Sequence, residues 1–430
     1  MKMIETAVDL AYTDIGWMCY VIDSTNKKPL EVRMNKPAIL GGTPVRETKI
    51  SYGRQYIDDA DIRAVTDVLK SGYITCGPKI GELEAKLCEI TGAKYAVAVS
   101  NGTAALHLAC LAMDLGPGDE LITTPITFAA SANCALYCGA KPVFADINPD
   151  TYNISPESIR QKITPATKAV VAVDFTGQAV ELNKIREICR ERNLILIEDA
   201  AHSIGTKYNG QPVGSIADMT TFSFHPVKTV TAGEGGAVTT NDENLYRKLL
   251  RLRAHGITRN MDEMKNPSDA PWYYEQTELG YNYRITDFQA ALVASQLNKL
   301  PAFSKRRKEI VARYNEAFAD MPEIIIQKEI PESDTTRHLY IIQLNLPLLT
   351  CNRREFFEAM CAENICPQVH YIPVYYHSHY EALGYTKGLC PNAEALYEGI
   401  LSIPLFYSMT DEDVEDVITA VKKLISYYKK

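Results

Sequence analysis

The sequence predicts an α/β protein in which helices cover both faces of a mostly parallel sheet. From about residue 58 onward, short apolar segments alternate with amphipathic ones, as strands alternate with helices in this class. The short segments are apolar throughout rather than at every second residue, which is typical of strands buried on both faces. A chain of 430 residues with 46% hydrophobic content is long enough for one large core and a smaller second core.

The expected elements follow one another in a regular order. Two amphipathic helices come first, over residues 58–72 and 81–92. Strands are then expected over 95–100, 120–125, 141–147, 166–175, 194–200 and 218–224, and helices over 102–113, 126–139 and 181–193. Parallel sheets of this kind bind ligands at the carboxyl ends of their strands, so the residues that follow the strands are the first candidates for a site.

The C-terminal part predicts a smaller α+β domain. Its expected elements are a strand over 338–344, a helix over 353–364, a strand over 366–374 and a closing helix over 410–430. The closing helix has an acidic start and a basic end, which suits the helix dipole. We therefore expect an N-terminal extension to which we assign no role (1–35), a large domain (36–284) and a small C-terminal domain (285–430).

The charge balance argues against two classes of partner. With 53 acidic and 45 basic residues the formal net charge is −8, which is mild and of the wrong sign for binding nucleic acid or a membrane surface. The pair His377 and His379 lacks further ligands at metal-binding spacing, so a loop role is favoured and no metal is expected.

The cysteines are scattered. The chain has 11 of them without any CxxC pair, which indicates reduced thiols in a cytoplasmic protein. Cys134 and Cys138 share a helix face and either bind something or are small buried hydrophobes. The second interpretation is favoured, because free cysteines are usually buried in this way.

Three features fall at the carboxyl ends of predicted strands. The first, SNGTAAL (100–106), opens a helix whose free N–H groups can hold a phosphate. The second is Glu198 with Asp199, which the strand 194–200 delivers to the rim of the sheet. The third is Ser223 followed by Lys228 in SFHPVKTVTAGEGG (223–236).

Each feature alone has an ordinary structural explanation, as a helix start, a cap and a solvated lysine. Together they match what pyridoxal phosphate requires. That cofactor needs a phosphate cradle, an acid that keeps its pyridine nitrogen protonated and a lysine amine that forms a Schiff base. A lysine in this role must be neutral to add to a carbonyl, so it belongs in a partly dry pocket that lowers its pKa.

At this point the sequence resembles the DegT/StrS sugar aminotransferases. Four motifs match that family in order: SNGTAAL, EDAAHSIG, SFHPVKTVTAGEGG and GYNYRITDFQAAL. The resemblance runs from about residue 36 to the C-terminus. It implies a pyridoxal-phosphate enzyme of fold type I, with a mostly parallel seven-stranded sheet in the large domain.

The resemblance also implies the cofactor contacts. Lys228 corresponds to the Schiff-base lysine, and Asp199 to the partner of the pyridine nitrogen. The remaining implied cofactor residues are Gly102, Thr103 and Ala104 at the phosphate, Ser223 as a further hydrogen bond, Phe128 stacked on the ring, His202 on the oxygen side and Asn282 at the phosphate of a neighbouring subunit. The last of these implies a homodimer. Some relatives carry histidine in place of the lysine and deoxygenate their substrate, and Lys228 argues against that chemistry.

A closer similarity concerns the substrate. Segments such as YGRQYI (52–57), SGYIT (71–75) and QVHYIPVYYHSHY (368–380) are similar to the UDP-sugar C4 aminotransferases of pseudaminic acid biosynthesis. The similarity implies a UDP-linked 4-keto-6-deoxy-N-acetylhexosamine as acceptor and L-glutamate as amino donor. The implied sugar-nucleotide residues are Tyr52, Gly72, Tyr73, Ile74, Asn101, Gln368, His370 and Tyr371.

Two alternatives stay open at this stage. One is a sister aminotransferase that acts on another nucleotide sugar, such as a bacillosamine or 4-amino-arabinose precursor. The other is a non-catalytic protein that binds the cofactor or a sugar as a regulator. The family's VHYIPVH segment reads VHYIPVY here, so Tyr375 departs from the pattern at its last position.

Overall fold

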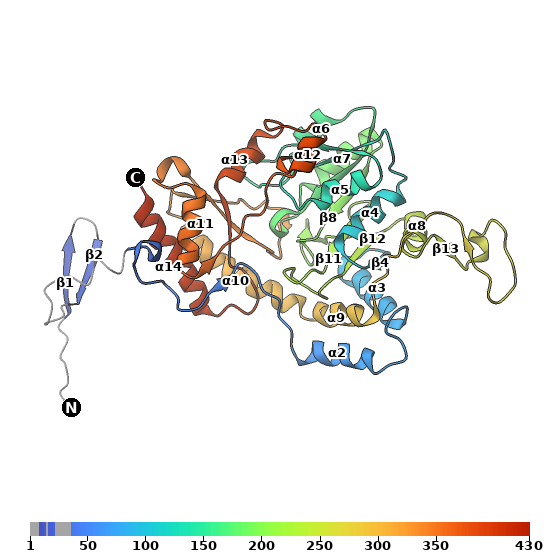
Figure 1. The fold of residues 1–430 in the computed structure, drawn as a ribbon, viewed down its shortest axis with the longest axis horizontal. Coiled ribbons are helices and arrows are strands. Elements are labelled where there is room, and N and C mark those ends of the chain that lie inside the picture. Colours follow the sequence, from blue (N-terminus) through green and yellow to red (C-terminus); the bar gives the residue numbers. More distant parts are fainter. Residues whose placement is uncertain (1–7, 14–15, 22–35) are drawn as a thin grey trace.

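The computed structural model describes residues 8–13, 16–21 and 36–430 (Figure 1). Of the predicted N-terminal extension, it describes only β1 (Val8–Thr13) and β2 (Gly16–Val21). The two strands pair in antiparallel register. The other residues of the extension lie outside the described part of the chain.

The largest sheet has seven strands in the order β4-β12-β11-β8-β7-β5-β6. Their bounds are β4 Tyr95–Val99, β5 Glu120–Thr123, β6 Lys141–Phe144, β7 Thr167–Val173, β8 Ile195–Asp199, β11 Met219–Ser223 and β12 Gly236–Thr240. Strand β12 runs antiparallel to both of its neighbours, and the remaining adjacent pairs are parallel. The predicted mostly parallel sheet is confirmed.

Helices cover both faces of this sheet. One face packs against α3 (Pro78–Thr91), α7 (Leu182–Arg192) and α9 (Asp287–Leu297), and the other against α4 (Gly102–Ala112), α5 (Ala130–Tyr137) and α8 (Glu243–Arg253). Successive residues of a strand point to opposite faces, so in β8 Leu196 lies in the first core and Ile197 in the second. Burial on both faces is the reason that the strands are apolar without alternation.

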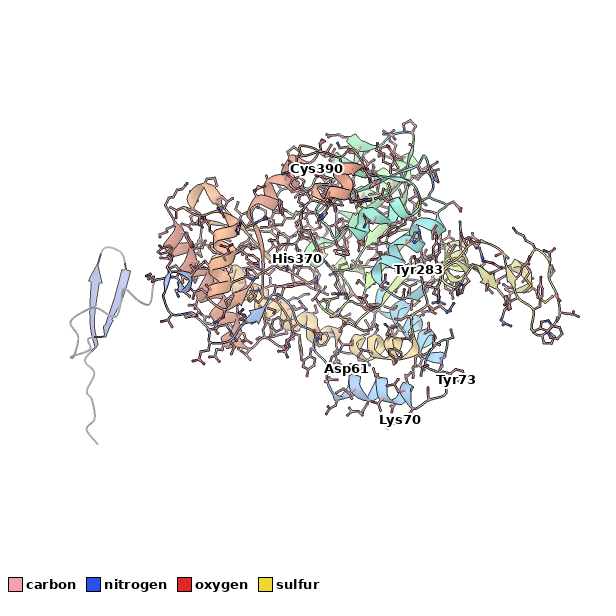
Figure 2. The ribbon with its side chains drawn as sticks, viewed as in Figure 1. Asp61, Lys70, Tyr73, Tyr283, His370 and Cys390 are labelled. Carbon is pink, nitrogen blue, oxygen red and sulfur yellow. The ribbon has the colours of Figure 1, made fainter. Side chains whose placement is uncertain are left out.

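A further helix, α2 (Asp59–Leu69), is fastened to α9 by a buried carboxylate (Figures 1 and 2). Asp61 accepts hydrogen bonds from Ser295 Oγ (2.7 Å) and Gln296 Nε2 (2.6 Å), and it pairs with the ammonium group of Lys299. The side chain of Asp58 caps the first turn of α2. These contacts hold the first predicted helix against the sheet domain.

The C-terminal part has its own core. A three-stranded antiparallel sheet of β15 (Ile324–Ile326), β17 (Tyr340–Leu344) and β19 (Ile400–Ile403) shares this core with α10 (Leu300–Phe318), α11 (Arg353–Ala362) and α14 (Asp411–Tyr428). Residues near the start of the folded region join it, because β3 (Ile50–Ser51) pairs in parallel with β18 (Ile365–Cys366) and Ile50 is buried there. The predicted α+β character is confirmed.

The remaining elements are short. They are α6 Pro156–Lys162, α12 Ser378–Ala382, α13 Pro391–Gly399, β9 Lys207–Tyr208, β10 Gln211–Pro212, β13 Ile257–Thr258, β14 Glu275–Gln276 and β16 Ser333–Asp334. The segment that contains β13 and β14 extends away from the sheet domain in Figure 1.

Two predicted elements are shorter than expected. The strand predicted over 366–374 ends at Cys366, because Pro367 and Pro373 have no N–H group to donate to a sheet. The helix predicted over 126–139 begins only at Ala130, and the residues before it form a turn beside the active-site cavity described below.

The predicted domain boundary at residue 285 stays a prediction. The side chains of Ala290, Val293 and Leu297 in α9 pack in the core of the large sheet, whereas Ile310 and Tyr314 in α10 pack in the C-terminal core. We therefore propose that the change from one domain to the other takes place within α10.

Candidate active site

A cavity of about 910 Å³ lies at the carboxyl ends of the central strands of the seven-stranded sheet. Residues of the sheet domain and of the C-terminal part line it together. Most of the residues predicted for the site line it together. They are Tyr52, Asn101, Gly102, Thr103, Ala104, Phe128, Asp199, His202, Ser223, Lys228, His370 and Tyr371. Segments that are more than 300 residues apart in the sequence therefore meet in one hollow.

Five predicted residues lie outside this cavity: Gly72, Tyr73, Ile74, Asn282 and Gln368. All five are exposed, and Tyr73 and Ile74 have relative exposures of 62% and 54%. Tyr73 lies beyond the end of α2, well away from His370 in Figure 2. The roles predicted for these residues stay predictions.

Lys228 reaches the cavity from a turn after β11. Its backbone N–H donates to the carbonyl oxygen of His225 (2.9 Å), which closes that turn. Among the described residues that line the cavity, Lys228 is the only lysine or arginine. Burial lowers the pKa of Lys228 to about 8, although the carboxylate of Asp199 opposes this change. The lowered pKa increases the neutral fraction of the amine near physiological pH, and the neutral form is the one that a nucleophilic lysine requires.

Asp199 is the last residue of β8, and it is buried with its carboxylate facing the cavity. The hydroxyl of Ser131 donates to one carboxylate oxygen (2.7 Å), and the N–H of Ala201 donates to the other (3.1 Å). Burial raises the pKa of Asp199, and these two hydrogen bonds and the charge of Lys228 oppose that rise. Ser131 thus fixes the carboxylate, although no sequence motif singled it out.

Glu198 does not lie at the rim of the sheet with Asp199, so this expectation was wrong. Because the two residues are neighbours in a strand, their side chains point to opposite faces. Glu198 is completely buried, accepts a hydrogen bond from Thr220 Oγ1 (3.0 Å) and lies beside the buried Asp174. Burial raises the pKa of Glu198 to about 7 and that of Asp174 well above its usual range.

The N-terminus of α4 opens into the cavity. Its first intrahelical hydrogen bond runs from the N–H of Ala105 to the carbonyl of Asn101 (3.1 Å), so the N–H groups of Gly102 and Thr103 precede the ladder and can bind an anion. The N–H of Ala104 instead donates to the side-chain oxygen of Asn101 (2.8 Å), which caps the helix. Asn101, predicted as a sugar contact, therefore has a structural task as well.

Glycine at position 102 allows this helix to approach β11 closely. A Cβ atom there would lie 2.9 Å from the Cβ atom of Ser223, which is closer than real side chains pack. The N-terminus of α4 and the side chain of Ser223 are consequently neighbours, and Lys228 lines the same cavity. The predicted cradle is thus a consequence of close backbone packing.

Three neutral imidazoles, those of His202, His338 and His370, also line the cavity. His202 Nε2 lies 3.1 Å from the hydroxyl of Tyr371, and the rings of His202 and His338 are 4.5 Å apart. Nδ1 of His370 lies 2.8 Å from Ser402 Oγ. Burial, and then the charge of Lys228, lowers the pKa of His370 to about 3 and that of His202 well below its usual range.

Sequence reasoning missed several residues that line the cavity. Besides Ser131 and His338 these are Thr127, His107, Tyr137, Tyr281 and Tyr283. Thr127 and Ser131 lie within four residues of Phe128, which the sequence analysis named, so they were within reach. Tyr281 and Tyr283 lie in the motif GYNYRITDFQAAL, in which only Asn282 was named. His107, Tyr137 and His338 carry no signal, since an aromatic residue on a helix or after a loop is more often part of a core.

The described residues contain no group of three or more His, Cys, Asp or Glu side chains arranged to hold a metal ion. No helix in the described part of the chain is long and apolar enough to cross a membrane. His377 and His379 lie beside a second, shallower hollow of about 520 Å³, which shares Phe128 and Tyr371 with the first.

The residues of the main cavity fit pyridoxal phosphate. An anion cradle formed by Gly102, Thr103 and Ser223 and a buried carboxylate, Asp199, lie around one lysine of lowered pKa. Together with the seven-stranded sheet, this arrangement defines a pyridoxal-phosphate-dependent aminotransferase.

The comparisons with known proteins agree. The model of the DegT/DnrJ/EryC1/StrS aminotransferase family matches residues 55–422, and the chain belongs to that family. Solved relatives are recorded in pyridoxal phosphate and pyridoxamine phosphate forms. The chain is therefore an aminotransferase with pyridoxal phosphate as its cofactor.

Two curated relatives and one solved structure illustrate the similarity. The spore coat polysaccharide biosynthesis protein SpsC of Bacillus subtilis is 41% identical over 378 residues, which cover 87% of this chain and 97% of that protein. The UDP-4-amino-4,6-dideoxy-N-acetyl-beta-L-altrosamine transaminase of Campylobacter jejuni is 39% identical over 385 residues, covering 89% and 99%. The Helicobacter pylori aminotransferase PseC, involved in pseudaminic acid biosynthesis, superposes with a TM-score of 0.82 at 32% identity, covering 88% and 100%.

Proposed function

We propose that this aminotransferase transfers the amino group of L-glutamate to C4 of a UDP-linked 4-keto-6-deoxy-N-acetylhexosamine. The product is the UDP-4-amino-4,6-dideoxy sugar, as made by a UDP-4-amino-4,6-dideoxy-N-acetyl-beta-L-altrosamine transaminase. The observation that carries this proposal is the shared cavity. Tyr52, His370 and Tyr371, predicted to bind the sugar nucleotide, line the same hollow as Lys228 and Asp199.

The relatives support the choice of substrate. The Campylobacter jejuni transaminase is similar over 99% of its own length, so the sugar-binding part is included in the match. The Helicobacter pylori PseC has the same fold over its whole chain. Both names refer to the same class of amino sugar.

The residues of the cavity divide the chemical work. Bound pyridoxal phosphate supplies the electron sink that transamination requires. Lys228 would bind the cofactor covalently, and its amine, whose pKa burial lowers to about 8, would carry the proton that moves during the reaction. Asp199 would hold the pyridine nitrogen, and the N-terminus of α4 would hold the phosphate. The wall of neutral imidazoles and Tyr371 offers hydrogen bonds to sugar hydroxyls without adding charge.

A second candidate has a specific observation in its favour. The spore coat polysaccharide protein SpsC is slightly more identical to this chain than the Campylobacter jejuni transaminase. In addition, Tyr375, which departs from the family's VHYIPVH segment, is buried and donates to Glu394 Oε1 (2.6 Å) rather than facing the cavity. A sister enzyme with another nucleotide sugar is therefore the runner-up.

The experiment that separates them is a substrate panel. Purified protein with pyridoxal phosphate and L-glutamate would be incubated with UDP- and GDP-linked keto sugars, and the products identified by NMR. We expect amination at C4 of the UDP-linked 4-keto-6-deoxy-N-acetylhexosamine, with the Lys228→Ala protein as a negative control. Turnover of another sugar alone, or amination at another carbon, would select the sister enzyme. No turnover with any sugar, together with no reaction of the bound cofactor with glutamate, would favour a non-catalytic regulator.

We further propose that the working unit is a cytoplasmic homodimer in which Asn282 serves the neighbouring subunit. Asn282 lies outside the cavity of its own chain and is exposed, as expected of a residue that acts across an interface. Its neighbours Tyr281 and Tyr283 line the cavity, so the segment borders the site that a second copy would complete.

A further inference from the structure

The second hollow, of about 520 Å³, adjoins the active-site cavity and has no role in the site described so far. Thr127, Phe128 and Tyr371 line both hollows, so these three residues form a shared wall. The two hollows are therefore adjacent, and a ligand of sufficient length that is held near Lys228 can occupy both.

Apolar side chains that the fold leaves uncovered line the second hollow. Phe128 has a relative exposure of 62%, and Ile372 one of 42%. Ala129 and Val369, both half-buried, extend this apolar surface. Large apolar side chains that gather around a hollow are typical of a ligand-binding site rather than of an ordinary surface.

Polar groups accompany this apolar surface. The side-chain oxygen of Asn133 accepts a hydrogen bond from the hydroxyl of Tyr380 (2.7 Å), and among the described residues this leaves the two amide N–H groups of Asn133 for a ligand. His377 and His379, for which the sequence favoured a loop role, are exposed at the start of α12 and line the hollow as well. An amide and two imidazoles can both donate to and accept from the polar edge of a nucleobase.

The fold holds the backbone around the second hollow in place. The N–H of Val374 donates to the carbonyl oxygen of Pro125 (3.0 Å), which ties the loop after β18 to the segment before α5. Tyr380 is only 2% exposed, and its ring packs edge-on against that of Phe144, so it anchors α12. The hollow is therefore formed before any ligand arrives.

The charge of the second hollow indicates which part of a nucleotide sugar fits it. Among the described residues that line it, none is a lysine or an arginine. Proteins usually bind the negative charges of a diphosphate with such side chains. The hollow therefore suits the uncharged nucleoside rather than the diphosphate.

We propose that the second hollow binds the uridine end of the sugar nucleotide, with the base against Ile372 and its polar edge toward Asn133 and His377. This inference rests on the proposed function, in which the keto sugar reaches Lys228. A nucleotide sugar joins its sugar and its nucleoside through a diphosphate, so the nucleoside lies many bonds away from the reacting carbon. With that carbon at Lys228, the nucleoside extends past the shared wall into the second hollow.

Two exposed apolar residues of the same segment provide a matched pair of variants. Ile372 lines the second hollow, whereas Leu383, directly after α12, lines neither hollow. Their relative exposures are similar, at 42% and 49%. Serine at either position should therefore have a similar effect on the fold, and only Ile372→Ser should change the binding of the nucleotide.

The test measures the binding of UDP to the pyridoxal-phosphate holoenzyme by isothermal titration calorimetry. Ile372→Ser and the double variant His377→Ala/His379→Ala should each weaken UDP binding about tenfold, which corresponds to about 1.4 kcal/mol. Leu383→Ser should bind UDP as the wild type does. The absorbance spectrum of the bound cofactor checks that the active site of each variant is intact.

Fluorine NMR locates the base directly. The bound resonance of 5-fluoro-UDP should differ between the wild type and Ile372→Ser, because the substitution changes the surroundings of the base. The same resonance should coincide in the wild type and Leu383→Ser. A bound resonance that is identical in all three proteins would place the base elsewhere and overturn the proposal.

Other results would also overturn it. One is a wild-type holoenzyme that does not bind UDP, and another is an unchanged affinity in Ile372→Ser and the double histidine variant. Equal losses in Ile372→Ser and Leu383→Ser would indicate a general effect on the fold and count against the site. The proposed function fails separately: if the substrate panel shows no amination of the UDP-linked sugar while the variants still differ in UDP binding, the sugar is wrong and the nucleoside site stands.

Discussion

The residues predicted for the cofactor and those predicted for the sugar differ in how a single chain brings them together. All but one of the cofactor residues line one cavity, and the exception is Asn282. Of the eight predicted sugar residues, four lie outside the cavity: Gly72, Tyr73, Ile74 and Gln368.

The difference has a physical cause. Parallel strands all end at the same edge of a sheet, so residues just after β4, β8 and β11 are brought together by the fold itself. The four sugar residues outside the cavity come instead from the segment between α2 and α3 and from the loop after β18, which no common element aligns. The sheet therefore positions the cofactor residues at the centre of the site, whereas separate loops position the sugar residues at its rim. The following substitutions test that contrast.

The largest expected effect is at the centre of the site. Lys228→Ala should lower transaminase turnover by about a thousandfold or more, because it removes both the covalent attachment and the group that moves the proton. The variant should still fold, since the side chain of Lys228 lines a cavity rather than packing in a core, and circular dichroism provides the control. Borohydride reduction of the wild-type holoenzyme should tag Lys228, and a tag on another lysine would contradict its role.

The second substitution is Asp199→Asn, which should retain the cofactor but lose about a hundredfold in rate. Turnover close to that of the wild type would contradict the assignment. The pH dependence offers a separate readout in the cofactor-free protein. Labelling of Lys228 by trinitrobenzenesulfonate should increase as pH rises through about 8, where the amine loses its proton. Because the carboxylate of Asp199 raises the pKa of Lys228, the midpoint should move to lower pH in Asp199→Asn.

The third substitution tests whether the rim belongs to a second chain. Asn282→Asp should weaken cofactor binding and lower turnover by about tenfold or more, because a carboxylate would repel the phosphate. Mixed with the Lys228→Ala protein under conditions of subunit exchange, it should recover about a quarter of wild-type activity, since half of the dimers would carry one intact site. A mixture that exchanges subunits and stays as inactive as its parents would place Asn282 in its own chain's site or in none.

The smallest effect is expected at Ser131, which supports the centre without touching the reacting atoms. Ser131→Ala removes one of the two hydrogen bonds to the carboxylate of Asp199, and a loss of about 1.4 kcal/mol, near the low end for a bond to a charged group, would lower turnover about tenfold. Ser131→Thr keeps the hydroxyl and should recover part of the rate. Equal loss in both variants would indicate a packing role, and the midpoint of Lys228 labelling would distinguish the two explanations.

The sequence predicted the layers of the fold and the centre of the site well. Uninterrupted apolar strands indicated a buried sheet, and motifs at the strand ends indicated Lys228, Asp199 and the start of α4. These features are local to a strand and the few residues after it, so the sequence carries them directly.

Other features could not be read from the chain. The contact of Ser131 with Asp199 joins residues 68 positions apart, and the contact between His202 and Tyr371 joins residues 169 positions apart. The short strand at Ile365–Cys366 was overestimated because the apolar pattern outweighed the two prolines that end it. The position of Glu198 was misjudged because two adjacent acids were treated as one feature, although a strand sends neighbours to opposite sides.

Strand β8 thus carries one acid that faces the cavity, Asp199, and one that is buried on the other face of the sheet, Glu198. Which face each acid occupies depends only on whether its position along the strand is odd or even. Inserting or deleting a single residue between Ile195 and Glu198 would exchange the two roles, turning the carboxylate of Asp199 into the packed layer. We expect strand β8 to accept changes of side chain but none of length. For anyone who redesigns this enzyme, the count of residues in β8 is a stricter constraint than most of their identities.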